Sequence, residues 1–229
     1  MPRSPHAFAH PVRLPSTRRR ALACFAVSFS AIVSFLTSPS FAAPPSQASD
    51  SGAKPLFEQS ALFVAGTDGY HTYRIPSLLV TKAGSVLAFC EGRKTGSGDH
   101  GDLDLVMKRS TDGGRTWSEQ TIVYEEGDTA KITIGNPCPV VDQQTGTIWL
   151  PFCRDNKHVL VTHSQDDGRT WSKPRDITAD VVKPGWVWVA TGPGVGIQLT
   201  AGPHRGRLVI PSDHRVVLAD KSSEWNSHM

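Results

Sequence analysis

An eight-residue segment occurs twice in this chain, as STDGGRTW at residues 110–117 and as SQDDGRTW at residues 164–171. The copies begin 54 residues apart and agree at six of eight positions. A period of this size, holding about four short strands, is typical of one blade of a β-propeller. Within the segment, the aspartate can accept hydrogen bonds from its own turn, the glycine permits positive φ, and the tryptophan can cover the side of a sheet. We therefore predict that both copies close the same hairpin in successive blades, in a structural and not a catalytic role.

The sequence after residue 43 favours strands over helices. Short apolar runs alternate with segments rich in Gly, Pro and Asp, for example SVLAFCEG, LDLVMKRS and HVLVTHS. No sustained helical spacing of apolar residues occurs in this part of the sequence. The repeat and the runs together predict an all-β fold, in which residues 59–229 form about three to three and a half blades of a propeller.

Residues 1–42 have the layout of a cleaved secretory signal peptide. Three arginines at residues 18–20 precede an uncharged run at residues 21–36, and small residues stand before the predicted cleavage point. The alternative is a membrane anchor, but a run of sixteen residues is short of the about 20 that a span needs. We expect residues 43–58 to form a flexible linker, and the protein to be secreted or periplasmic without a stable membrane span.

Charge and cysteine content exclude several classes of function. The chain has 24 basic and 21 acidic residues, but five arginines precede residue 43, so the remainder carries a net charge of −2. This balance does not predict a nucleic-acid partner. Cys90, Cys138 and Cys153 have no zinc-binding spacing, and we expect neither a metal nor another cofactor. Cys90 and Cys153 fall in apolar runs and are predicted to be buried strand residues.

Several motifs make the sequence resemble a known family. The octapeptides resemble the Asp-box, and Tyr73-Arg74-Ile75-Pro76 resembles the [FY]RIP segment near the start of sialidase catalytic domains. The similarity to bacterial exo-α-sialidases extends over about residues 56–220 and includes NPCPVVDQQTGTIWLPFC, GPGVGIQL and GRLVIPSDH. It implies a six-bladed β-propeller of the sialidase type, of which only the N-terminal portion is present here.

The resemblance also implies a reaction. Sialidases are glycoside hydrolases that release terminal sialic acid from glycoproteins, glycolipids or oligosaccharides with retention, and they need no cofactor. They use a tyrosine nucleophile, because the carboxylate on the anomeric carbon would repel an anionic attacker. A trans-sialidase would use the same pocket with another acceptor. The alternative from a different class is a non-enzymatic Asp-box propeller that binds glycans or protein.

Four residues match the substrate-binding and catalytic positions of the family. Arg74 matches one of three arginines that hold the substrate carboxylate, for which a planar and permanently charged guanidinium is well suited. By the same match, Glu91 would orient Arg74, and Arg93 would lie at the pocket rim, although a simple pair between Glu91 and Arg93 is the structural alternative. Asp99, in a Gly-rich loop, matches the catalytic acid/base, with Asp102 as the alternative.

Four further residues are weaker candidates. His71 can line the pocket mouth or be an ordinary surface residue, and Asn136 can contact a substituent or cap a turn. Trp186 and Trp188 alternate along one strand and are expected to share one face. That face either packs against a neighbouring blade or lines a sugar-binding pocket.

The sequence also departs from the family pattern. No position matches the tyrosine nucleophile, its glutamate partner or the second and third arginines, which the resemblance assigns to later blades. We therefore expect this chain to be a truncated piece of the enzyme, with little or no hydrolysis by itself.

Overall fold

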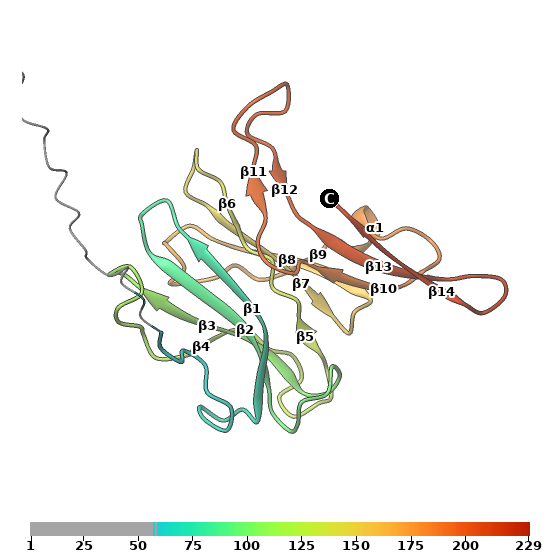
Figure 1. Ribbon diagram of the computed structural model, residues 1–229, viewed down its shortest axis with the longest axis horizontal. Coiled ribbons are helices and arrows are strands. Elements are labelled where there is room, and N and C mark those ends of the chain that lie inside the picture. The colour runs from blue at the N-terminus through green and yellow to red at the C-terminus, as the bar shows by residue number, and fades with distance from the viewer. Residues whose placement is uncertain (1–56, 58) are drawn as a thin grey trace, which may run out of the picture. The chain divides into compact units, whose positions relative to one another are not determined.

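The computed structural model describes residue 57 and residues 59–229 (Figure 1). The signal peptide predicted at residues 1–42 lies outside the described residues, and so does the linker predicted at 43–58, apart from Phe57. Phe57–Met229 form one compact unit. Within that unit's described residues, no helix is long and apolar enough to cross a membrane.

The first sheet has four antiparallel strands that neighbour each other in sequence order. They are β1 (Thr72–Val80), β2 (Val86–Arg93), β3 (Leu103–Ser110) and β4 (Thr121–Tyr124). Seven of the eight residues of β2 are buried, because this strand lies between β1 and β3 and carries an apolar run on both faces.

The second sheet follows the same order, but its first strand is split into two pieces that both pair with β7. Its strands are β5 (Ile134–Gly135), β6 (Val140–Val141), β7 (Ile148–Arg154), β8 (His158–Ser164) and β9 (Arg175–Asp176). The split leaves the residues between β5 and β6 free to take irregular backbone geometry.

The third sheet contains β10 (Trp186–Thr191), β13 (Ser212–Val217) and β14 (Ser223–His228), and it follows the short helix α1 (Thr178–Val181). A two-stranded ribbon of β11 (Ile197–Gln198) and β12 (Leu208–Val209) lies between β10 and β13 in sequence. Figure 1 shows the three sheets following one another along the chain without closing into a ring. The predicted all-β fold is therefore confirmed, with three successive sheets where the repeat spacing predicted three to three and a half blades.

The main apolar core joins the first and second sheets. Its fully buried members are Leu87, Phe89, Leu105, Ile134, Ile148, Leu150 and Phe152. Burying one such side chain contributes roughly 1.5–3 kcal/mol. The predicted burial of Cys90 and Cys153 is also confirmed, since they are 2% and 1% exposed.

Both octapeptides close hairpins at equivalent places, between β3 and β4 and between β8 and β9. Asp112 accepts hydrogen bonds of 2.9 Å from the backbone N–H groups three and four residues on, and Asp166 does the same at 3.1 and 2.9 Å. Gly114 and Gly168 have φ values of 90° and 79°. The predicted structural role, in which both copies close the same hairpin in successive sheets, is confirmed.

Candidate active site

A cavity of about 460 Å³ is lined by residues from all three sheets. Its charged lining residues are Arg74, Glu91, Arg93, Asp99, Asp213 and Arg215. The structure therefore brings together the four residues that the sequence selected, and it adds two from β13.

The inner strands of the first two sheets are interrupted beside this cavity. The register of β1 shifts between Arg74 and Ser77, and Ile75 between them has a φ of 54°. Asn136, directly after β5, has a φ of 56°. Left-handed backbone is uncommon outside glycine and a clear outlier for a β-branched residue, and such outliers cluster at functional sites. Both Ile75 and Asn136 line the cavity.

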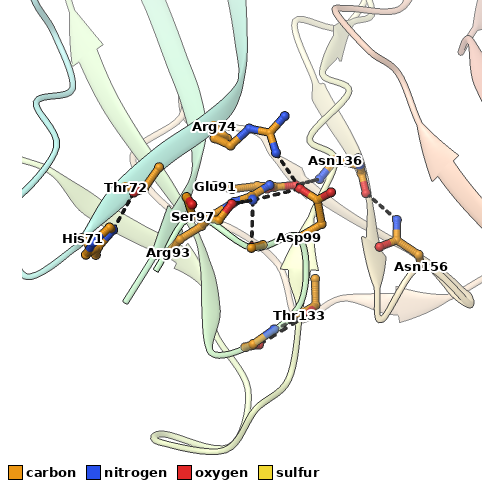
Figure 2. Close-up of polar contacts among 12 residues, drawn as sticks. His71, Thr72, Arg74, Glu91, Arg93, Ser97, Asp99, Thr133, Asn136 and Asn156 are labelled. Carbon is orange, nitrogen blue, oxygen red and sulfur yellow. Dashed lines mark hydrogen bonds and ion pairs between the residues drawn. The ribbon is translucent and has the colours of Figure 1, made fainter. Parts of the chain in front are cut away.

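Arg74 presents a half-exposed guanidinium to the cavity. Its side chain is 46% exposed, and its Nη1 lies 2.5 Å from Oδ1 of Asp99 (Figure 2). Its backbone carbonyl, next to the bulge in β1, accepts a hydrogen bond of 3.0 Å from the buried thiol of Cys90. The planar fork of N–H donors on its guanidinium suits a carboxylate.

Arg93 lies deeper than the predicted position at the pocket rim, and that prediction is wrong. Its side chain is only 2% exposed. Nε and Nη2 donate to Oε2 of Glu91 at 3.1 and 2.6 Å. Nη1 donates to the carbonyls of Ser97 and Gly98 at 2.6 and 2.8 Å, and to Oδ1 of Asp99 at 2.9 Å. Arg93 is thus a buried support for the loop that carries Asp99.

Glu91 pairs with Arg93, so the predicted pair between Glu91 and Arg74 is wrong. The two partners are two residues apart on β2 and therefore share one face of the strand. The other carboxylate oxygen, Oε1, accepts a hydrogen bond of 3.0 Å from the N–H of Asn136. Gly135 has to be glycine here, because a Cβ atom would collide with the Glu91 carboxylate.

Asp99 projects into the cavity from the loop at residues 94–101. Its side chain is 69% exposed, and it accepts hydrogen bonds from both Arg74 and Arg93. The hydrogen bond from Arg93, together with the charges of Arg93 and Arg74, lowers the pKa of Asp99 below its ordinary value despite an opposing effect of burial. In this arrangement Asp99 is ionised.

Asp102 is held away from the cavity. Lys94 contacts Asp102 at 3.1 Å and Asp104 at 3.3 Å, so these two carboxylates share one side of the chain as the alternation predicts. Asp104 also accepts a hydrogen bond of 2.6 Å from the hydroxyl of Tyr70. These contacts fix the base of the 94–101 loop, and sequence reasoning did not find the role of Tyr70.

Trp186 and Trp188 lie on opposite faces of β10, and the prediction of a shared face is wrong. The register of β10 against β13 shifts between them, because Val187 is an extra residue. Trp188 lines the cavity and packs edge-on against Trp225, with ring centroids 4.9 Å apart. Trp186 stacks on His214 at 3.7 Å on the other face.

Of the two remaining polar candidates, Asn136 lines the cavity and His71 does not. Asn136 lines the cavity and accepts a hydrogen bond of 2.9 Å from Nδ2 of Asn156. His71 contacts Thr72 at 2.7 Å and is absent from the cavity lining. No motif pointed to Arg215, which pairs in register with Trp188 across β10 and β13. Across residues 57 and 59–229, no group of three or more His, Cys, Asp or Glu side chains could hold a metal ion.

These features define a class of protein: successive sheets of a partial β-propeller, two of them with Asp-box turns, that line a cavity in which Arg74 faces Asp99. The family model that matches the chain is the BNR repeat-like domain, over residues 84–229. The chain is 39% identical to the sialidase of Micromonospora viridifaciens, covering 77% of this chain and 32% of that protein. It is 36% identical to the exo-alpha-sialidase of Aspergillus fumigatus, covering 66% and 43%.

Among solved structures, the Hadza microbial sialidase Hz136 superposes with a TM-score of 0.62 at 30% identity, covering 71% of this chain and 36% of that one. The chain belongs to the sialidase family of BNR-repeat β-propellers. It spans about a third of the Micromonospora sialidase and less than half of the Aspergillus one.

Proposed function

We propose that this protein is an exo-α-sialidase, which hydrolyses the bond to terminal sialic acid with retention of configuration. The observation that carries the proposal is the half-exposed guanidinium of Arg74 in a cavity that also holds Asp99. The names of the relatives, sialidase and exo-alpha-sialidase, support the same activity. The substrates would be sialylated glycoproteins, glycolipids or oligosaccharides.

Arg74 would bind the C1 carboxylate of the sugar through its fork of N–H donors. Glu91 and Arg93 would support this site from beneath, since both are buried and paired with each other, and Arg93 also contacts Asp99. The C1 carboxylate is bonded to the anomeric carbon, so holding it on Arg74 fixes the position of that carbon in the cavity while positive charge develops there.

Asp99 would act as the acid/base. It would first donate a proton to the leaving oxygen and later accept one from the attacking water. Its exposure on a loop at the cavity gives it access to a bound sugar. The tyrosine nucleophile and its glutamate, which sialidases use, have no match in this sequence, and this proposal assigns them no residue.

We also propose that the protein is secreted or periplasmic. The support is the sequence of residues 18–42, with its arginines, uncharged run and small residues. Detection of a mature N-terminus at residue 43 in the extracellular or periplasmic fraction would test this.

The activity is tested with a fluorogenic sialoside and with two matched substitutions. Arg74→Ala should reduce kcat/KM at least about 100-fold, because the substrate carboxylate loses its charged partner. Arg115→Ala removes an equally charged but exposed arginine in the first octapeptide and should leave kcat/KM unchanged. Asp99→Asn should abolish turnover, whereas Asp102→Asn should retain it.

Two outcomes would contradict the proposal. Equal losses in Arg74→Ala and Arg115→Ala would remove the carboxylate-binding role from Arg74. Binding of the fluorogenic sialoside without release of the fluorophore, in a protein that also supplies the tyrosine nucleophile and its glutamate, would instead favour the glycan-binding propeller over the hydrolase.

A further inference from the structure

The guanidinium of Arg74 holds a carboxylate of the protein itself, that of Asp99. We propose that an incoming sialic acid carboxylate replaces Asp99 on Arg74, while Arg93 keeps Asp99 in the cavity and Asp99 takes up a proton from solvent. This inference rests on the proposed function and assigns Arg93 as a positioning residue for the acid. Figure 2 shows the two arginines approaching Asp99.

The contact between Arg74 and Asp99 is the exchangeable one. Both side chains are substantially exposed, at 46% and 69%, and exposed ion pairs are weak because water screens them. A single oxygen of Asp99, Oδ1, reaches Nη1 of Arg74. A free carboxylate can offer both of its oxygens to the guanidinium fork, which is a stronger arrangement.

The contact between Arg93 and the loop is the permanent one. Arg93 is 2% exposed, and three of its contacts fall on consecutive loop residues, the carbonyls of Ser97 and Gly98 and the carboxylate of Asp99. The Nε and Nη2 groups on the other side of its guanidinium donate hydrogen bonds to the buried carboxylate of Glu91. Moving the loop out of the cavity would break several buried, charge-assisted hydrogen bonds, so Asp99 stays within reach of a bound sugar.

The exchange changes the charge around Asp99. While Asp99 is paired with Arg74, the groups of Arg93, Arg74 and His100 favour the ionised acid, and Glu91 opposes it. Asp213 and Arg215 on β13 line the same cavity with opposite charges. After exchange, Asp99 has lost one arginine and gained a neighbouring carboxylate, and two close carboxylates favour protonation of one. The ligand thereby produces the protonated acid that the first catalytic step requires.

Calorimetric titration tests this with N-acetylneuraminic acid as the probe, in buffers of different ionisation enthalpy. For the wild type we expect net proton uptake on binding at pH 5–6. Since binding takes up a proton, affinity should fall as pH rises through this range. Asp99→Asn should bind about five-fold more tightly at pH 6, without proton uptake, because the neutral amide no longer competes as an anion. Asp102→Asn is the matched control and should behave as wild type.

Arg93→Lys tests the positioning role by its pH profile. A lysine at this position keeps the positive charge but cannot contact both Glu91 and the 94–101 loop. Asp99 is then no longer held close to the bound carboxylate, so the pH dependence of probe binding should weaken. Arg74 should still bind the probe. Wild-type binding without proton uptake, or Asp99→Asn affinity equal to or below wild type, would overturn the inference and leave the proposed function intact. Absence of binding by wild type and Asp99→Asn alike would overturn both.

Discussion

The two copies of the octapeptide fold alike but face different neighbours. The hydroxyl of Ser110 contacts Asp112 at 2.7 Å, and that of Ser164 contacts Asp166 at 2.8 Å, so the turn itself is the same. The copies differ at the second and fourth positions, and the fourth is the one that changes the contacts. Gly113 in the first copy has no atoms close to where a Cβ would lie.

Asp167 takes that position in the second copy and reaches the first sheet. Its carboxylate accepts hydrogen bonds from Thr81 at 2.5 Å and Ser85 at 2.6 Å, and it pairs with Arg109 of β3. The next residue, Gly168, lies against Leu87 so closely that a Cβ would not fit. The comparison teaches that the shared positions build the same turn in both copies. In the second copy, the differing residue Asp167 and the shared residues Gly168 and Trp171 also contact the first sheet.

The largest expected difference concerns the two tryptophans. Trp171 packs edge-on against Phe89 with centroids 5.8 Å apart, whereas Trp117 donates to the carbonyl of its own turn at Gly114. Trp171→Ala should lower the free energy of unfolding by about 3 kcal/mol, and Trp117→Ala by about 1 kcal/mol. Urea denaturation measures both. Equal losses would mean that the second turn does not join the sheets.

The next largest effect is expected at the fourth position. Asp167→Asn should cost about 2 kcal/mol, because Arg109, with a side chain only 16% exposed, loses its charged partner. The reciprocal Gly113→Asp should change stability by less than about 0.5 kcal/mol, since Asp167 itself adopts a φ of 65° close to the 75° of Gly113. The same denaturation assay compares them, and a large cost in Gly113→Asp would contradict the assignment.

The smallest effect is a pH dependence that both turns should share. The hydroxyl and N–H of Thr170 lower the pKa of Asp166 to about 2, and the equivalent groups of Thr116 lower the pKa of Asp112. Because the folded-state pKa lies below the ordinary 3.8, this stabilisation is present above about pH 4 and is lost as pH falls towards 2. Asp112→Asn and Asp166→Asn should each flatten the acid limb of stability against pH, by similar amounts. Flattening in only one variant would show that the two aspartates do not stabilise their turns in the same way.

Much of the fold could be predicted because its signals are local. The apolar runs and the octapeptides each determine a structure within a few residues. The strands and the hairpin turns could therefore be predicted from the spacing of these segments. Arg74 and Asp99 came from motifs, and they do meet in one cavity.

The features that could not be predicted depend on which of several possible partners a side chain or a strand contacts in the folded protein. Glu91 has Arg74 opposite it in register and Arg93 two residues along its own strand, and only the packed structure decides between them. Arg215 enters the cavity because β13 pairs with β10, a long-range arrangement that leaves no mark in the local sequence.

The extra residue Val187 has a consequence for comparing relatives of this protein. If β10 kept Val187 but paired without this bulge, Trp186 and Trp188 would lie two regular positions apart and would both face the side of Arg215. A relative whose strand lacks the bulge would therefore place on the pocket side a residue whose counterpart in this protein lies on the opposite face. Relatives should be aligned at this strand by their pairing with β13 before any residue of the pocket wall is assigned.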